Sequence, residues 1–235
     1  MVRSIPYAEA DLVVTVFSET LGLVPVLARG ARSYRKGAPS SLEPLHTLRL
    51  ELGDRQGADL LSLRAAAIAV ARPRLAADLD CMQAAGQALR WLRQGLPPRT
   101  PEPETWSEIN RLLDTLDSEP LTRSPLRLVA EFGIRLLATL GYALHLDRCV
   151  VCGRSCQPGR AAYVDPSRGG IVCSQCGGAS RLLDGSTRDR LLQAARGGEG
   201  VLLEADAGQG MELVDAMLRA HVGIEPEPSR RNPCK

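Results

Sequence analysis

Aromatic residues are scarce in this sequence and make up only 3% of the chain. This scarcity weakens any mode of single-strand binding that relies mainly on base stacking. Long apolar runs are missing as well: the longest comprises the seven small residues 65–71, far fewer than the roughly 18 that a membrane span needs. The first residues contain no apolar signal region, so we expect no membrane segment and a cytoplasmic location.

The sequence also lacks the short motifs that carry common enzymatic chemistry. It contains no phosphate-binding G-x-x-x-x-G-K-S/T loop, no H-E-x-x-H helix and no G-x-S-x-G nucleophile turn. No H-x-E accompanies its cysteine pairs, as a zinc deaminase would require. We therefore expect a protein that is not an enzyme.

Acidic residues are absent from one basic stretch near the N-terminus. The net charge of the chain is only +2, yet no Asp or Glu lies between Glu19 and Glu43. The segment 28–37 within this stretch has glycines near both ends, and its cations are Arg29, Arg32, Arg35 and Lys36. We interpret it as a basic loop that follows phosphates, with an ordinary solvated loop between strands as the alternative.

Cysteines are concentrated in one segment, since five of the seven lie within residues 149–176. Two C-x-x-C pairs, separated by twenty residues, have the spacing of a structural zinc site: Cys149 and Cys152, then Cys173 and Cys176. Four thiolates complete a tetrahedron and leave no position for substrate, so we expect one structural Zn²⁺. An iron–sulfur cluster is the main alternative, and Cys156 is either a free thiol or an alternative ligand.

Disulfides and redox chemistry are the other interpretations of these cysteines. Disulfides would require an oxidising compartment, for which the N-terminal residues offer no address. A redox C-x-x-C usually occurs singly beside a βαβ pattern, and the sequence contains no such pattern.

The first part of the chain has the period of two that is typical of β-strands. Short runs rich in valine and leucine, separated by turn residues, predict five strands, at about 2–6, 11–18, 22–31, 44–52 and 58–70. In the last two of these runs apolar residues alternate with polar ones. A G-D-R-Q-G hairpin turn at 53–57 precedes the last of them. Residues 1–74 are therefore expected to form a compact antiparallel barrel.

Beyond residue 75 the apolar period changes to three and four, which predicts helices. The expected ranges are 75–95, 105–118, 125–140, 186–196 and 210–222. Thr105 and Glu108 resemble a capping box at the start of the second, and Gly141 a cap at the end of the third. We expect a helical domain formed by residues 75–146 and 181–224, with a zinc module at 147–180 inserted into it. A disordered tail is expected at 225–235.

Three blocks of sequence resemble the RecO family of bacterial recombination and repair proteins. They are "YAEADLVVTVFSETLGLVPVLARGAR" from residue 7, "LEPLHTLRLEL" from residue 42 and "LGYALHLDRCVVCG" from residue 140. Tyr7, Glu9 and Asp11 open the first block, and the resemblance extends to about Arg196. Members of the family have a few more residues before the tyrosine motif, so the first strand is short in this chain. A barrel that is incomplete or open at that edge is therefore an alternative to a closed one.

The resemblance implies a multidomain α+β protein with an N-terminal five-stranded OB-fold barrel, a helical domain and a module carrying the four cysteines named above. It also implies a non-enzymatic mediator of double-strand break and gap repair in the RecF pathway. Such proteins bind single- and double-stranded DNA, anneal complementary strands, contact single-stranded DNA-binding protein and help RecR to load RecA.

An OB barrel would present its loops to DNA, so we assign DNA binding to the basic loop. The candidate residues are Arg29, Arg32, Tyr34, Arg35 and Lys36. Two other functions remain open. One is a zinc-stabilised adaptor that binds proteins and does not touch DNA, and the other is an enzyme that uses the thiolates for redox work.

Overall fold

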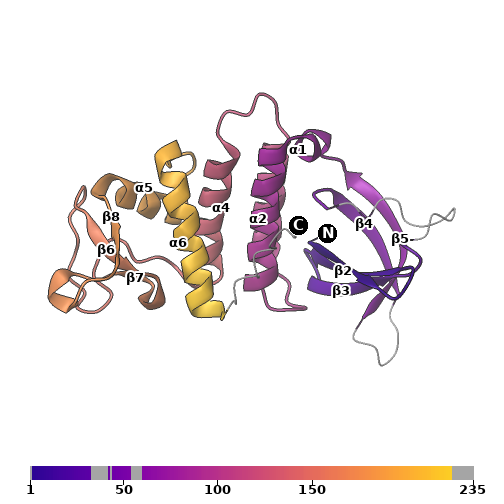
Figure 1. The fold of residues 1–235 in the computed structure, drawn as a ribbon, viewed down its shortest axis with the longest axis horizontal. Helices are drawn as coiled ribbons and strands as arrows, with labels where there is room; N and C mark the ends of the chain where they lie inside the picture. The colour runs from indigo at the N-terminus through magenta and orange to yellow at the C-terminus, as the bar shows by residue number, and fades with distance from the viewer. Residues whose placement is uncertain (1, 33–41, 43, 54–59, 224–235) are drawn as a thin grey trace, which may run out of the picture.

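The computed structural model of this protein describes residues 2–32, 42, 44–53 and 60–223. A five-stranded sheet lies at one end of the molecule and a three-stranded sheet at the other. Helices occupy the space between the two sheets (Figure 1). The fold is therefore mixed α+β, as the sequence predicts.

The N-terminal sheet is built from the five expected strands. They are β1 (Arg3–Tyr7), β2 (Asp11–Ser18), β3 (Gly22–Ala28), β4 (Thr47–Gly53) and β5 (Leu61–Val70). The register places Val14 opposite Val26 and Val16 opposite Val24. Because alternate residues of a strand share a face, these four valines form one small buried cluster.

The order of strands in this sheet is β1-β2-β3-β5-β4, which is the order of an OB barrel. The expectation of a wholly antiparallel barrel is wrong at one pairing, because β3 runs parallel to β5 at Val26 and Leu27. Closure of the barrel would pair the edge strands β1 and β4, and the described residues do not contain that pairing. Closure therefore stays a prediction. The expected 53–57 turn lies almost entirely outside the described residues.

The part of the chain that the structure describes contains six α-helices. They are α1 (Pro73–Ala77), α2 (Leu79–Gly95), α3 (Pro103–Leu116), α4 (Pro125–Thr139), α5 (Gly185–Ala195) and α6 (Glu204–Val222). The single helix expected at 75–95 is wrong, because Asp78 has an extended backbone conformation that ends α1. The Asp78 carboxylate then caps α2 by accepting a hydrogen bond from the Cys81 N–H at 2.8 Å.

The capping box expected at Thr105 and Glu108 is also wrong. The helix begins earlier, with Glu102 as its N-cap and Pro103 at the first helical position, where the missing N–H of proline costs nothing. Thr105 therefore lies inside the first turn, and its buried hydroxyl has no hydrogen-bond partner among the described residues.

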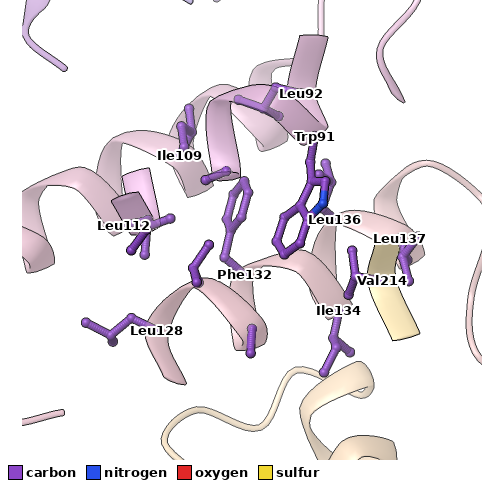
Figure 2. Packing of buried hydrophobic residues seen from close by; sticks show 14 of the residues in the cluster. Trp91, Leu92, Ile109, Leu112, Leu128, Phe132, Ile134, Leu136, Leu137 and Val214 are labelled. Atoms are coloured by element: carbon purple, nitrogen blue, oxygen red, sulfur yellow. The ribbon is translucent and has the colours of Figure 1, made fainter. Parts of the chain in front are cut away.

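Helix α4 is the centre of the main core because it is buried on nearly every side. Figure 2 shows Phe132 of α4 beside Trp91 of α2, with residues of α3 and α6 around them. Gly133 permits this packing, since a Cβ at that position would lie 2.4 Å from Cζ3 of Trp91. The Trp91 indole N–H donates to the Asp215 carboxylate at 2.7 Å, which satisfies the polar group of a fully buried ring.

The end of α4 confirms the predicted glycine cap. Gly141 has φ +82, and the Tyr142 N–H donates to the Leu137 carbonyl at 2.8 Å in a Schellman arrangement. The helix predicted at 210–222 begins six residues earlier, at Glu204. Gly210 instead lies inside α6, and a Cβ there would be only 3.4 Å from the Ala130 Cβ of α4.

The five-stranded sheet packs against α3 without a separate layer between them. Phe17 of β2 meets Trp106 of α3 edge to face, with ring centroids 5.7 Å apart. A cavity of only about 50 Å³ remains between Val2, strand β4 and this helix. The main hydrophobic cluster is continuous from Phe17 through the helices to the second sheet, and the boundaries predicted between domains stay predictions.

A buried arginine fixes the position of the sheet on the helices. Arg72 lies between β5 and α1, and only 2% of its side chain is exposed. Its guanidinium donates to the Leu45 carbonyl at 3.1 Å and to the Thr47 hydroxyl at 2.9 Å. The same group reaches the side chains of Asn110 and Asp114 on α3 at 3.2 and 2.8 Å. One side chain therefore joins the β4 end of the sheet to α3.

The second sheet lies at the far end of the molecule and belongs to the cysteine-rich segment. Its strands are β6 (Ala162–Asp165), β7 (Gly170–Ile171) and β8 (Arg181–Leu183), in the order β7-β6-β8. Two 3₁₀ turns, Pro166–Arg168 and Ser174–Cys176, connect these strands. The predicted tail at 225–235 lies outside the described residues.

Candidate metal centre and nucleic-acid interface

The four predicted metal ligands lie together. The Sγ atoms of Cys149, Cys152, Cys173 and Cys176 are all within 4.8 Å of one another. The distance from the Cys152 Sγ to the Cys173 Sγ is 3.8 Å, and a zinc tetrahedron with bonds of about 2.3 Å has sulfur–sulfur edges of roughly 3.8 Å. These residues therefore fit a four-thiolate metal ion.

Tight turns bring each pair of cysteines to a common point. In the first, the Gly153 N–H donates to the Cys149 carbonyl at 2.8 Å. In the second, the Gly178 N–H donates to the Cys173 carbonyl at 3.0 Å. The glycines after the pairs have positive φ, at +74 for Gly153 and +99 for Gly177, which side chains with a Cβ rarely adopt.

Backbone hydrogen bonds hold the two turns against each other. The Val150 N–H of the first turn donates to the Ile171 carbonyl of β7 at 2.9 Å. The Cys173 N–H donates to the Cys149 Sγ at 3.4 Å, which is a common arrangement for a thiolate ligand. The sulfur cluster is thus positioned by the backbone on both sides.

The thiols of the cluster differ in acidity. Hydrogen bonds from the backbone N–H groups of Cys173 and Cys152 lower the pKa of Cys149 to about 6. Hydrogen bonding with the thiols of Cys173 and Cys152 raises the pKa of Cys176 to about 12. Four adjacent sulfurs cannot all ionise without a cation, and a divalent ion would supply the compensating charge.

A buried arginine that the sequence does not reveal connects the cysteine-rich segment to the helices. Arg188 of α5 donates to the Leu146 carbonyl at 2.8 Å and to the Gln157 carbonyl at 2.8 Å. Its position on the apolar face of α5, three residues before Leu191, is the one signal that could have indicated burial. Cys156 stands in the loop that Arg188 holds and is not a member of the sulfur cluster.

The predicted basic loop begins directly after β3. Arg29 and Arg32 are exposed, whereas the candidates Tyr34, Arg35 and Lys36 lie outside the described residues. No carboxylate among the described residues forms an ion pair with Arg29 or Arg32. Their charges therefore face solvent and remain available to an anion.

Two contacts fix the base of this loop. The Asp11 carboxylate accepts a hydrogen bond from the Gly30 N–H at 2.8 Å, and the Arg32 N–H donates to the Ala10 carbonyl at 2.9 Å. Gly30 has φ +64, which places its N–H toward the turn between β1 and β2. The positions of Arg29 and Arg32 are thus set by the sheet itself.

Within the described residues, none of the helices combines the length and the apolar character that a bilayer crossing would need.

Comparison with known proteins accounts for nearly the whole chain. The family model described as Recombination protein O N terminal matches residues 1–71, and the one described as Recombination protein O C terminal matches residues 76–231. The chain belongs to the RecO family. The resemblance seen in the sequence blocks is thereby confirmed. The structure explains part of it, because Asp11 near the start of the first block holds Gly30 near its end.

Several curated members of the RecO family are similar over most of their length. A DNA repair protein RecO from Geobacter sulfurreducens is 32% identical over 225 residues, covering 94% of this chain and 90% of the relative. The proteins of the same name from Anaeromyxobacter dehalogenans (strain 2CP-1) and Anaeromyxobacter sp. (strain Fw109-5) are 31% and 28% identical over 231 residues. Each of these two alignments covers 95% of this chain and 89% of the relative.

Proposed function

We propose that this chain is a DNA-binding recombination mediator of double-strand break and gap repair in the RecF pathway. It binds single- and double-stranded DNA, anneals complementary strands and, together with RecR, helps RecA to load on DNA covered by single-stranded DNA-binding protein. It acts in the bacterial cytoplasm, at the nucleoid. Membership of the RecO family supports this proposal, as does the name DNA repair protein carried by its relatives.

The observation that carries the proposal is a pair of cations at the base of the loop for which the described residues supply no carboxylate partner. Arg29 and Arg32 extend from a turn that Asp11 ties to the five-stranded sheet. Sheets with this strand order bind nucleic acids through their loops in OB folds. Because aromatic residues make up only 3% of the chain, phosphate contacts contribute more to binding than stacking does.

The proposed Zn²⁺ has a structural role. Cys149, Cys152, Cys173 and Cys176 hold it, and four protein thiolates leave no position for a water molecule or a substrate. When bound, the ion supplies folding free energy to residues 147–180. The proposed mediator is therefore not an enzyme, and the OB domain (1–74) and helical domain (75–146 and 181–224) act by binding.

The test is a titration of labelled single-stranded DNA at several salt concentrations. Each neutralised phosphate contributes about 0.7 to the slope of log K against log salt on single strands. The variant Arg29→Ala/Arg32→Ala should reduce the slope by about 1.4, and addition of Arg35→Ala and Lys36→Ala by up to about 3 in total. Tyr34→Ala should cost about 1 to 3 kcal/mol only if a base stacks on the ring.

The matched control is Arg74→Ala/Arg219→Ala, which removes the same charge from two exposed helical positions. This control should leave the slope within about 0.3 of the wild-type value, since neither arginine belongs to the loop. A folded loop variant with unchanged affinity and slope would defeat the assignment. The adaptor function, without direct DNA binding, would then be favoured.

A further inference from the structure

Charge in the predicted zinc module, residues 147–180, is nearly balanced. The module includes four arginines and two acidic residues, Asp147 and Asp165, so its formal charge is +2. Four thiolates around a divalent ion contribute −2 together, so the position of each arginine matters more than the total. Two of the arginines are already paired with carboxylates, as Arg148–Asp147 and Arg168–Asp165.

Arg154 and Arg160 are the two remaining cations of this segment. Both are exposed, and neither forms an ion pair with any carboxylate in the described ranges. They line a pocket of about 290 Å³ whose walls include no Asp or Glu, although the predicted metal ligands Cys149 and Cys173 also line it. Buried Ile171 and Val172 also line it. The pocket therefore combines apolar residues with two guanidinium groups that pair with no described carboxylate.

An exposed tyrosine completes the pocket. Tyr163 of β6 lines it and is 42% exposed, and its cross-strand neighbour Leu182 of β8 is 56% exposed. An aromatic ring beside two cations is the combination that single-strand binding surfaces use for a base and its phosphates.

The position of this pocket separates it from the basic loop. The strands β6 to β8 lie at the opposite end of the molecule from the five-stranded sheet, with α4 and α6 between them (Figure 1). A DNA strand bound at one end of the molecule would leave the other end free for a second DNA strand.

We propose that the pocket formed by Arg154, Arg160 and Tyr163 is a second contact site for single-stranded DNA, in which the arginines bind phosphates and the tyrosine stacks on a base. This site rests on the proposed function of DNA binding and extends it. Charge decides the occupant, because apolar walls alone would suit many ligands, whereas two guanidinium groups that pair with no described carboxylate select a phosphate chain. One chain can then hold two strands at its two ends.

The experiment is a titration of the full-length, zinc-loaded chain with a labelled oligothymidylate of about six nucleotides, a length within the range that one small site occupies. The variants are Arg154→Ala/Arg160→Ala, Tyr163→Ala and Tyr163→Phe. The matched control is Arg148→Ala/Arg168→Ala, which removes the same charge from the same segment at arginines that do not line the pocket.

The wild-type chain and the matched control should each bind two oligonucleotides. Arg154→Ala/Arg160→Ala should reduce the salt slope at the second site by about 1.4. Tyr163→Ala should weaken that site about 5- to 140-fold, the equivalent of losing one stacked base, and Tyr163→Phe should retain it. The residues changed are exposed, so zinc content and melting temperature should not change.

Two results would overturn the second site. In the first, the pocket variant keeps the wild-type stoichiometry, affinity and salt slope while the loop variant loses binding. This result would rule out the second site and leave the proposed function intact. Equal losses in the pocket variant and the matched control would indicate only the overall charge of the segment. If the wild-type chain binds no DNA, the proposed function itself fails.

Discussion

Replacement of Arg72 by methionine tests whether one buried guanidinium joins the sheet to the helices. Methionine keeps the apolar stem and removes the charged donors, so the change creates little cavity. The buried Leu45 carbonyl loses its donor, at a cost of about 1 to 3 kcal/mol. The hydrogen bonds to Thr47 and Asn110 add about 1 kcal/mol. Asp114 adds little because it is 59% exposed and regains water.

We therefore expect Arg72→Met to lower the free energy of unfolding by about 3 kcal/mol, which corresponds to a fall in melting temperature of roughly 6 to 12 °C for a chain of this size. Urea unfolding followed by circular dichroism measures the change. The control is Arg74→Met, because Arg74 is 61% exposed and its ion pair with Glu119 is solvated, so less than about 0.5 kcal/mol should be lost. Equal effects of the two substitutions would refute the reasoning.

Three further predictions concern the metal, acid stability and nucleotide dependence. Elemental analysis should find one zinc ion per chain and no iron. Cys173→Ser should lower the melting temperature far more than Cys156→Ser, because Cys156 lies outside the sulfur cluster. Equal, small effects of the two substitutions would contradict a structural metal. Hydrogen bonds from Thr187 and then Ser186 hold the pKa of Asp184 well below its usual value, so its stabilisation is present above about pH 4 and is lost as the pH falls further. Asp184→Asn should reduce that loss in melting curves between pH 6 and pH 3, and identical pH dependence would refute the assignment. The purified chain should not hydrolyse ATP. Reproducible hydrolysis that a point mutation in this chain abolishes would contradict that prediction.

The elements that the sequence predicts well are those with a strong local pattern. Short valine-rich runs predict β2 and β3. Strand β2 has the expected bounds, Asp11–Ser18, and β3 begins at the expected Gly22 and ends at Ala28, three residues before the predicted end. The C-x-x-C spacing likewise predicts the sulfur cluster, because each pair is a local turn with a glycine after it. Local chemistry was sufficient in both cases.

The errors arise where distant residues decide the local structure. The helix expected from residue 210 begins at Glu204, so Gly210 lies inside α6, where close packing against Ala130 of α4 compensates for its cost. Arg72 and Arg188 look like surface cations, and only the folded chain brings buried carbonyl groups to their donors. The partners of these side chains are 27 and 42 residues away in the sequence, so no local pattern reveals them.

The central claim is that this chain binds DNA through the basic loop and anneals strands without turnover. The most direct measurement is the annealing rate of two complementary labelled oligonucleotides with no nucleotide present. The wild-type chain should accelerate annealing equally with and without ATP. The variant with Arg29, Arg32, Arg35 and Lys36 changed to alanine should lose most of this acceleration at low salt, and its difference from the wild type should shrink as salt rises. Annealing no faster than that of free DNA, or acceleration that is identical in the folded loop variant, would contradict the account.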